Sequence, residues 1–581
     1  MNEDLTNPLI KLQNNLENTV QKLFKVDVTM KFEVPPPQIE ADFSISTFII
    51  SKTINGNPLE IAKKLADYLN RNELIYVTKI SVLGPYINLI VNTKKLYHDI
   101  LNYIIKSGYE FGKSKVNNRQ TALIEFSSPN IAKPLGVGHL RSTIIGHALA
   151  NIYEWTGYEV VRDNHLGDWG TQFGELIYAY RSWGKDEVIN KNPIQELKKL
   201  YVKFHQEVGN NPAIKVKARS FFKELENENK DIVVLWKKFK EWSMVDFQKT
   251  YKRLGIEFDT CIGESFFAKQ TDNVIKECLS KKICKQDPNS PVVFVDSLND
   301  LPSFILRKQD GASLYLTRDL ATIKYRVRTY NPNIILYVVG NEQSLHFQQL
   351  FALAKQMKYV PKSMHVEHIF FGMVLSKGKK MSTRSGTLVE LKEVIIKAVE
   401  KSKEILKNST THLNKEEKEQ IAEIIGLGAI IYNDLHQSKA RNISFDFDNM
   451  IRLESGSSAY LQYTHVRIAS IIDKAGKKKK QHDIAPSQQY SFEHKKELVL
   501  AKKLLLFPSI ITEAQKTNSP HLICTYLEEL AQQFNSFYEA VSVIKAYNEI
   551  LFISRINLIK ATAQVIKDGL MLLGIKVPSK M

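Results

Sequence analysis

The clearest hydrophobic pattern in the chain predicts a strand, a helix and a second strand in close succession. Residues 122–124 form a short apolar run that ends in a Ser-Ser-Pro-Asn break, which is typical of a strand followed by a turn. After a Gly136-Val137-Gly138 loop, apolar residues recur at helical spacing over residues 140–152, and Gly157 stands where a helix commonly ends. Residues 159–161 are extended in pattern. This order is the βαβ unit of a doubly wound, Rossmann-like sheet that binds nucleotides.

The remaining pattern divides the chain into further parts. Residues 1–115 combine a helical start with alternating strand patterns, so we interpret them as a separate α+β domain. Residues 116–410 form an α/β Rossmann-like domain, interrupted at about 185–250 by a lysine-rich helical stretch. Residues 411–581 are almost entirely helical in pattern and predict an all-α domain. At 581 residues the chain is too long for one core, so several domains are expected.

The second half of the α/β domain has its own strand and helix signals. A helical pattern opens at Tyr315, and residues 334–340 form an apolar run that predicts a buried strand. Residues 369–375 are also strand-like and lead into a basic loop.

The glycine loop before residue 140 has the chemistry of an anion site. Gly136 and Gly138 allow a phosphate to approach the backbone, and His139 stands where the helix begins with unpaired N–H groups. For the tetrapeptide alone, a helix-capping loop with an incidental histidine is the better interpretation. The residues around it favour the phosphate site.

Composition narrows the class of protein. Lys and Arg total 80 against 62 Asp and Glu, a formal charge of +18, so a polyanion is the natural partner, although a membrane surface would also suit this charge. No apolar run is long enough to span a membrane, and the N-terminus lacks a basic-then-apolar leader, so we expect a cytoplasmic protein. The four cysteines lack paired spacing, which favours reduced thiols and predicts no metal site.

Two segments around the glycine loop carry a recognisable motif pattern, SSPNIAKPLGVGHLRSTIIG and NHLGDWGTQFG. They closely resemble the first signature region of arginyl-tRNA synthetases, which are class I aminoacyl-tRNA synthetases with a HIGH-type motif after the first strand. In this chain Gly136 stands where the first histidine of that motif is expected. The signature region comprises Pro129, Asn130, Ile131, Ala132, Lys133, Pro134, Leu135, Gly136, Val137, Gly138 and His139.

Downstream, the basic loop contains KMSTR, which resembles the class I KMSKS motif. A loop with several cations suits the charge that appears on departing pyrophosphate. Thr383 replaces the second lysine of the motif, and the resemblance implies that Lys133 substitutes for it. The catalytic candidates are therefore His139, Lys133 and Lys380, and the ATP-binding candidates are Gly136, Gly138, His139, His346, Lys380, Met381 and Ser382.

Further blocks resemble the arginine pocket of the family in order and approximate spacing. A planar guanidinium is selected by carboxylates that accept paired N–H bonds, which rejects lysine by geometry. The arginine-binding candidates are Ser128, Asn130, Glu264, Tyr315, Asp319 and Gln343, with Glu264 first among them. Singly, any of these acids would more often be a helix cap or a surface ion pair, but their joint occurrence favours the pocket.

Near the C-terminus, YLQYTHVR and LAQQFNSFYE resemble the helical anticodon-binding domain of the family. Aromatic side chains can stack on splayed bases while cations hold phosphates. The tRNA-binding candidates are Tyr460, Gln462, Tyr463, Arg467, Phe534 and Tyr538, although for each aromatic residue alone a place in the core is the better interpretation. For residues 1–115, the resemblance implies a grip on the tRNA elbow, and a packing or dimer domain is the alternative.

Taken together, the resemblance implies ATP-dependent attachment of L-arginine to tRNA(Arg) through an arginyl-adenylate. It implies Mg²⁺ carried with ATP, activation that depends on bound tRNA, a monomer, and no membrane partner. Two other interpretations remain open. One is a nucleotidyltransferase that uses the same glycine loop, although such chains lack the KMSK-like loop and a large helical C-terminal domain. The other is a synthetase-derived RNA-binding or amino-acid-sensing protein without catalysis, to which the missing first histidine gives some weight.

Overall fold

The computed structural model describes residues 7–33, 35–36, 38–114, 116–376, 379–380, 390–407, 413–444, 450–452, 454–478 and 490–581. The chain forms two compact units. The first unit comprises Met1–Lys113, Thr464–Ile510 and Tyr526–Asp568, and the second comprises Ser114–Tyr463, Ile511–Thr525 and Gly569–Met581.

The N-terminal part of the first unit is an α+β domain, as the sequence predicts. Its antiparallel sheet has the order β1-β2-β4-β3. The strands are β1 (Phe32–Glu33), β2 (Phe43–Ser46), β3 (Val77–Leu83) and β4 (Tyr86–Val91), and the helices are α1 (Pro8–Phe24), α2 (Phe48–Ile54), α3 (Pro58–Arg71) and α4 (Thr93–Ser107), followed by the short η1 (Gly108–Glu110). The start of α1 is specified locally, because the side chain of Asn7 accepts the N–H of Leu9 and Pro8 occupies the first turn.

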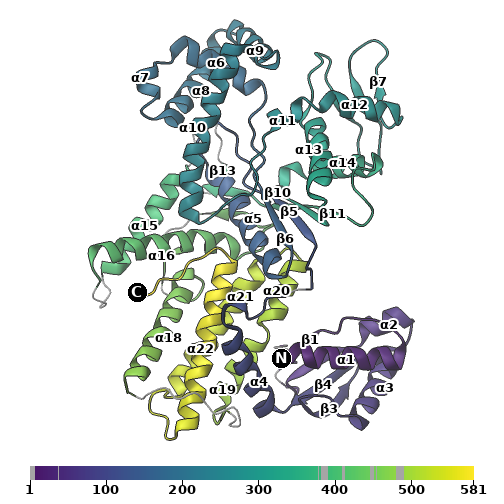
Figure 1. Cartoon of the computed structure of the whole chain (residues 1–581), viewed down its shortest axis with the longest axis vertical. Coiled ribbons are helices and arrows are strands. Elements are labelled where there is room, and N and C mark those ends of the chain that lie inside the picture. Colours follow the sequence, from purple (N-terminus) through teal and green to yellow (C-terminus); the bar gives the residue numbers. More distant parts are fainter. Residues whose placement is uncertain are drawn as a thin grey trace. The chain divides into compact units, whose positions relative to one another are not determined.

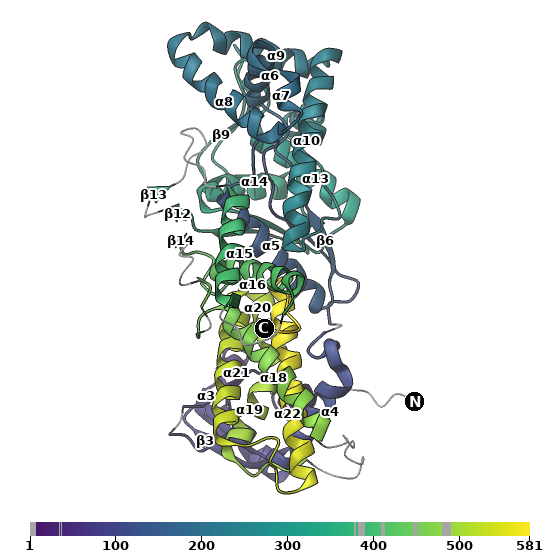
Figure 2. The same ribbon diagram turned by 90° about the vertical axis from the view of Figure 1, so that its left-hand side faces the viewer.

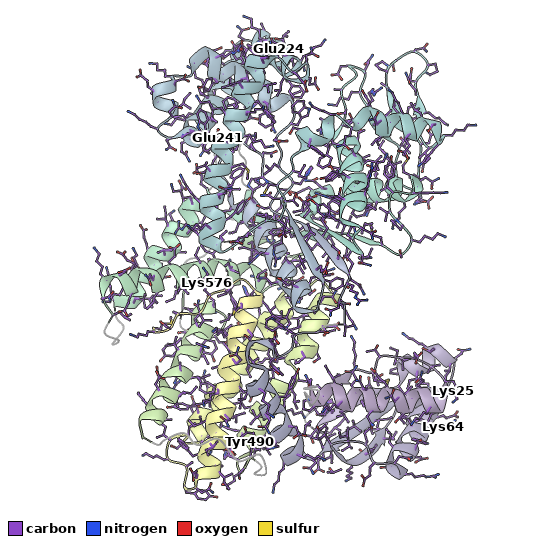
Figure 3. The ribbon with its side chains drawn as sticks, in the orientation of Figure 1. Lys25, Lys64, Glu224, Glu241, Tyr490 and Lys576 are labelled. Carbon is purple, nitrogen blue, oxygen red and sulfur yellow. The ribbon has the colours of Figure 1, made fainter. Side chains whose placement is uncertain are left out.

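The C-terminal region is helical, which confirms the expected fold class. Its helices are α18 (Ser458–Lys478), α19 (Lys495–Leu505), α20 (Phe507–Lys516), α21 (His521–Ala540) and α22 (Glu549–Leu572). All except α19 pass from one unit to the other. Within the first unit, Tyr490, labelled in Figure 3, lies against α4, with its ring 5.0 Å from that of His98. The α+β domain and part of the helical region therefore share one unit.

The second unit is built around a parallel sheet of order β11-β10-β5-β6 (Figure 1). Its strands are β5 (Thr121–Glu125), β6 (Glu159–Asp163), β10 (Ile334–Gly340) and β11 (His365–Phe371). They include the predicted strands of the βαβ unit and the predicted buried strand at 334–340. The run at 369–375 is not one strand, because β11 stops at Phe371 and β12 (Val374–Ser376) begins after Gly372. Carboxyl ends of parallel strands meet at one edge, which is where a ligand binds in such folds.

Helix α5 (Val137–Trp155) contacts strands β5, β6 and β10 of this sheet. It begins before the apolar pattern at Leu140, and it is buried nearly all round, so even Arg141 and Ser142 are enclosed. Helix and strand approach closely at Gly146, where an added Cβ would lie 2.1 Å from Cβ of Phe126. A glycine is needed there because any side chain would push the helix off the sheet.

The helical insertion is longer than the lysine-rich stretch alone suggests. It runs through α6 (Thr171–Trp183), α7 (Asp186–Ile189), α8 (Pro193–Asn210), α9 (Ala213–Glu226) and α10 (Lys230–Leu254). Helices α6, α8, α9 and α10 pack on one another, and Figure 2 shows them gathered together. Aromatic rings fill their interior, with Trp169 in contact with Phe222 and Trp236.

The remaining elements complete the second unit. The helices are α11 (Glu264–Ala268), α12 (Thr271–Ser280), α13 (Tyr315–Tyr330), α14 (Ser344–Gln356), α15 (Leu391–Lys407) and α16 (Lys415–Leu435), with the short η2 (Asn341–Gln343). Two small sheets contain β7 (Lys285–Gln286), β8 (Val293–Val295) and β9 (Phe304–Arg307), and β12, β13 (Lys379–Lys380) and β14 (Ile443–Ser444). Helices α12, α13 and α14 share a hydrophobic core with β10. Among the helices described, none combines the length and apolar character that crossing a membrane requires.

Candidate active site

The loop after β5 has an unusual backbone. Ser127, Ser128 and Ala132 all have positive φ values, of 70°, 43° and 63°. Residues with side chains adopt this region at a cost, and such strain gathers at functional sites. Hydrogen bonds hold the loop in place, since the N–H of Ser127 donates to Oγ of Ser142 at 3.0 Å and that of Ala132 to Oγ of Ser243 at 2.7 Å.

His139 stands in the first turn of α5 as a neutral hydrogen-bond donor. Its Nδ1 accepts the backbone N–H of Gly136 at 3.2 Å, so the proton of the neutral ring lies on Nε2. Burial lowers the pKa of His139 to about 4, and the charge of Lys133 acts in the same direction. At neutral pH the imidazole therefore offers one N–H to an oxygen without adding a charge.

Gly138 leaves the helix start open. It is exposed, and a Cβ built on it would meet no atom within 4 Å. The first turn of a helix presents unpaired N–H groups with positive polarity. The space over Gly138 can therefore hold an anion such as a phosphate.

Lys133 receives a contact that the sequence did not suggest. Its ammonium lies 4.3 Å from the centre of the Tyr201 ring, in a cation–π contact with helix α8 of the insertion. Tyr201 itself is buried. The insertion therefore contacts the candidate phosphate lysine directly.

The KMSTR-like loop is only partly described. The backbone of Lys380 pairs with Leu375 in the β12–β13 ladder. Its side chain, and all of Met381 and Ser382, lie outside the described residues. Their contact with phosphates stays a prediction.

Glu264 begins helix α11 and faces a guanidinium that belongs to the chain itself. Nε of Arg318 lies 3.1 Å from Oε2 of Glu264, and the two side chains are only 7% and 13% exposed. The two atoms are close but are not aligned as a hydrogen bond. The Arg318 guanidinium also lies 4.6 Å from the ring centre of Tyr315. The sequence predicted Glu264 as the contact of a substrate guanidinium and Tyr315 as part of the same pocket, and the structure brings both to Arg318.

Burial raises the pKa of Glu264 to about 8, and Asp319 and Asp168 add to the shift although Arg318 opposes it. Burial is also the largest cause of the raised pKa of the Tyr315 phenol. The charges of Glu264 and Asp319 raise that pKa further, and the charge of Arg318 lowers it. The predicted pocket acids therefore lie in one electrostatic neighbourhood.

Asp168 holds the start of α11, and the sequence analysis did not select it. Its carboxylate is fully buried and accepts the N–H and Oγ–H of Ser265, both at 2.8 Å, and Nζ of Lys240 at 2.7 Å. A Cβ on Gly263 would lie 2.3 Å from this carboxylate, so the backbone must pass close to it. Asp168 belongs to the motif NHLGDWG, and that was the available signal.

Asp319 and His346 join the two predicted halves of the site. Nε2 of His346, a candidate for ATP, lies 2.7 Å from Oδ2 of Asp319, a candidate for arginine. Burial opposes ionisation of Asp319, but the hydrogen bond with His346 and the charges of His346, His165 and Arg318 hold its pKa below the usual range. His165 is buried, and neither ring nitrogen has a hydrogen-bond partner among the described residues.

The remaining arginine candidates lie on loops near the carboxyl ends of β5 and β10. Oγ of Ser128 is 3.5 Å from Oε1 of Glu125, a long contact. Asn130 is exposed, and its Oδ1 occupies the place where a side chain on Gly167 would be, at 2.1 Å. Gln343 is exposed at the end of η2. These polar groups are therefore accessible to a ligand at the carboxyl edge of the sheet.

The tRNA-binding candidates fall into two groups. Tyr460, Gln462 and Tyr463 belong to the second unit, and Arg467, Phe534 and Tyr538 belong to the first. Gln462 and Phe534 are fully buried, so neither presents a surface on which an RNA base could stack. Gln462 donates to the carbonyl of Lys576 at 2.7 Å, and Phe534 stacks on Tyr538 at 5.9 Å.

The other members of these groups are accessible. Tyr463 is 40% exposed, and Tyr460 and Tyr538 are half-buried. The guanidinium of Arg467 lies 4.8 Å from the ring centre of Tyr538. The predicted aromatic and cationic combination is therefore present at this pair.

A parallel sheet that presents a histidine-bearing helix start at its carboxyl edge is the arrangement of a nucleotide-binding domain, and the family match makes it a class I aminoacyl-tRNA synthetase catalytic domain. Residues 100–447 match the family described as "tRNA synthetases class I (R), catalytic domain". Residues 461–581 match the DALR anticodon binding domain and residues 11–91 the arginyl tRNA synthetase N terminal domain.

Whole-chain comparisons agree. The chain is 38% identical over 549 residues to the arginine–tRNA ligase of Clostridium perfringens, covering 94% of this chain and 95% of the relative. It is 36% identical over 572 residues to that of Halothermothrix orenii, covering 98% and 99%. The arginyl-tRNA synthetase structure from Plasmodium falciparum superposes with a TM-score of 0.79 at 25% identity, covering 98% and 99%. The chain belongs to the arginyl-tRNA synthetase family, as its motifs indicated.

Proposed function

We propose that the site divides the reaction of the family between a phosphate half around His139 and an amino-acid half around Glu264 and Asp319. That reaction is the ATP-dependent attachment of L-arginine to its cognate tRNA through an arginyl-adenylate. The carboxylate of arginine attacks the α-phosphorus of ATP in line and pyrophosphate leaves, so no protein nucleophile is needed.

In the phosphate half, ATP lies over the loop from Gly136 to His139. Two observations support this placement: a Cβ on Gly138 would meet no atom within 4 Å, and His139 keeps its proton on Nε2, where it can be donated to a phosphate oxygen. Lys133 and Lys380 neutralise the leaving pyrophosphate, with Met381 and Ser382 beside them. His346 completes the ATP contacts.

In the amino-acid half, Asp319 and Glu264 receive the substrate guanidinium. A carboxylate prefers paired N–H bonds from a planar fork, whereas the ammonium of lysine is a point charge. Tyr315 covers the guanidinium, and Ser128, Asn130 and Gln343 hold the amino and carboxylate end.

The partners follow from this assignment. Residues 411–581 bind the anticodon region of the tRNA, with Tyr463, Tyr538 and Arg467 on the surface, and residues 1–115 contact its elbow. Mg²⁺ is carried with ATP, because the phosphate oxygens are the hard ligands that this cation prefers. The protein acts as a monomer in the cytoplasm.

The observation that carries the arginine assignment is the pair of Glu264 and Arg318. A buried carboxyl group that already lies against one guanidinium is placed to meet a second, and contact with the substrate guanidinium favours its ionised form. We expect ATP–pyrophosphate exchange that requires arginine and rejects lysine, measured with and without tRNA. Glu264→Ala abolishes the exchange while tRNA binding survives, and Glu241→Ala, an exposed change on α10, leaves both intact.

The same assay separates the alternatives. A nucleotidyltransferase would exchange pyrophosphate with another acceptor and ignore arginine and tRNA. A protein without catalysis would bind tRNA or arginine and exchange nothing. Normal arginine-dependent exchange by Glu264→Ala would refute the pocket assignment.

A further inference from the structure

One face of helix α8 in the insertion points at the phosphate half of the site. Gln195, Lys198 and Tyr201 are spaced three residues apart and therefore share this face. Nε2 of Gln195 donates to Oε2 of Glu390 at 2.7 Å, and Nζ of Lys198 donates to Oε1 at 2.6 Å. The third member, Tyr201, lies beneath Lys133.

Glu390 is placed to pass this contact to the helix start of α5. It is 7% exposed and follows the residues of the KMSTR-like loop. Its backbone forms an antiparallel bridge with Gly136, and the N–H of Leu391 donates to the carbonyl of Leu135 at 2.8 Å. One residue thus joins α8 to the turn that precedes His139.

The chain on the other side of the same loop is also tied to α5. Arg141 is fully buried, and its Nη1 donates to the carbonyls of Gly372 at 2.8 Å and Arg441 at 2.7 Å. Its Nε lies 3.0 Å and 3.2 Å from the two carboxylate oxygens of Asp434. The residues before and after the loop are therefore both held against the helix that begins beside His139.

We propose that helix α8 supports the ATP-phosphate site from outside. Its residues Lys198, Gln195 and Tyr201 act as positioning residues. Through Glu390 they fix the turn at Gly136, and through the ring of Tyr201 they fix the ammonium of Lys133. The insertion thereby sets the geometry of the activation step. This inference rests on the proposed function and extends it to residues that do not touch the substrates.

The chemistry of the contact between Glu390 and helix α8 explains why losing it would lower the reaction rate. A nearly buried carboxylate that accepts two hydrogen bonds, one of them from an ammonium, has a fixed orientation. Removing Gln195 or Lys198 would allow the Glu390 side chain to move, and with it the backbone that pairs with Gly136. A misplacement of about 1 Å at a phosphate site can cost up to about 100-fold in rate.

The first test is a double-mutant cycle of Glu390→Gln and Lys198→Met in the full chain. Exchange of pyrophosphate is measured with arginine, ATP and tRNA, together with the thermal unfolding midpoint. We expect each single change to lower kcat on the order of tenfold with the KM for arginine unchanged, and the double change to cost no more than either. Lys199→Met, on the solvent side of the same helix, is the matched control with wild-type kinetics.

A reversed pair, Lys198→Glu with Glu390→Lys, tests the charge pairing itself, with the thermal unfolding midpoint measured beside kcat so that a change in stability is told apart from a change in positioning. We expect it to recover part of the kcat lost by either reversal alone. Single variants with wild-type kcat, or a double variant whose loss is the product of the single losses, would overturn the proposal. If the wild-type chain catalyses no arginine-dependent exchange, the proposed function fails first, and this inference fails with it.

The second test addresses Tyr201. Tyr201→Phe keeps the ring under Lys133, and Tyr201→Leu removes it. We expect the phenylalanine variant to retain wild-type exchange and the leucine variant to lose kcat and to raise the KM for ATP. Equal kinetics for the two variants, at equal thermal midpoints, would overturn the part of the proposal that concerns Lys133.

Discussion

At the scale of single residues, the pocket is set by how a few charges are buried. Glu264 lies beside Arg318 yet keeps a raised pKa, because burial outweighs the contact and because Asp319 and Asp168 add negative charge nearby. Asp319 behaves in the opposite way, since His346 stabilises its ionised form. Two carboxyl groups in one neighbourhood therefore differ in protonation near neutral pH.

The first prediction concerns proton release. Below a pH of about 8 the free protein holds a proton on Glu264, and contact with the substrate guanidinium favours the carboxylate. Arginine binding should therefore release a proton, and its affinity should rise with pH up to about 8 and then level off. Isothermal titration calorimetry at pH 7 in buffers of different ionisation enthalpy measures the release. It should vanish in Glu264→Gln, and an unchanged release in that variant would assign the proton to another group.

A second prediction concerns Gly138. Its Cβ position is open, so Gly138→Ala should leave the thermal midpoint unchanged or slightly raised, since alanine favours a helix over glycine by about 0.5–1 kcal/mol. The added methyl group occupies the space over the helix start, so the KM for ATP should rise while the KM for arginine does not. Steady-state exchange kinetics check this. An unchanged KM for ATP would place the phosphates elsewhere.

At the scale of elements, helix α11 is too short to hold its own position. It has 5 residues, and its first turn depends on Asp168, which comes from the loop after β6. Lys240, from α10 of the insertion, binds the same carboxylate. The direction of Glu264 is therefore decided by two elements other than its own helix.

The third prediction tests this dependence with Asp168→Asn. The amide has one acceptor oxygen instead of two, so it cannot accept all three hydrogen bonds that Ser265 and Lys240 donate to the carboxylate, and the free energy of unfolding should fall by about 1.5–3 kcal/mol. The KM for arginine should rise more than the KM for ATP, because Glu264 moves and His139 does not. Urea denaturation and exchange kinetics measure both. Equal rises in the two KM values would mean that Asp168 supports the whole site rather than α11.

At the scale of the whole molecule, charge is the property that matters most for the tRNA. The chain carries a formal charge of +18, and a basic protein that neutralises phosphates releases counterions on binding. Small substrates in a buried pocket depend far less on salt, because buried pairs are weakly screened.

The fourth prediction follows from this difference. The affinity for tRNA should fall steeply between about 50 and 200 mM salt, with a log–log slope near the number of phosphates contacted. The KM for arginine at saturating tRNA should change little. Filter binding and exchange kinetics over the same salt series measure the two. A salt-independent affinity for tRNA would contradict a phosphate-dominated interface.

The order of residues along the chain was enough to predict the strands and the helix around the site and to indicate the family. Periodicity predicted β5, α5, β6 and β10, because strand and helix repeats are written locally in the order of apolar residues. The resemblance to the family's motifs indicated Lys133 and Glu264, and the glycine loop together with that resemblance indicated His139. These statements need only neighbours along the chain.

Which side chains contact one another could be learned only from the folded chain. The pairs Glu264 with Arg318, Lys133 with Tyr201, and Lys198 with Glu390 join residues far apart in the sequence, so their contacts depend on how helices of the insertion and of the sheet pack. Burial is likewise a property of packing, which is why Phe534 could be proposed as an RNA contact from its motif and still lie in the core. The local sequence shows which interactions a side chain is able to make. Packing between distant segments determines which partner it contacts.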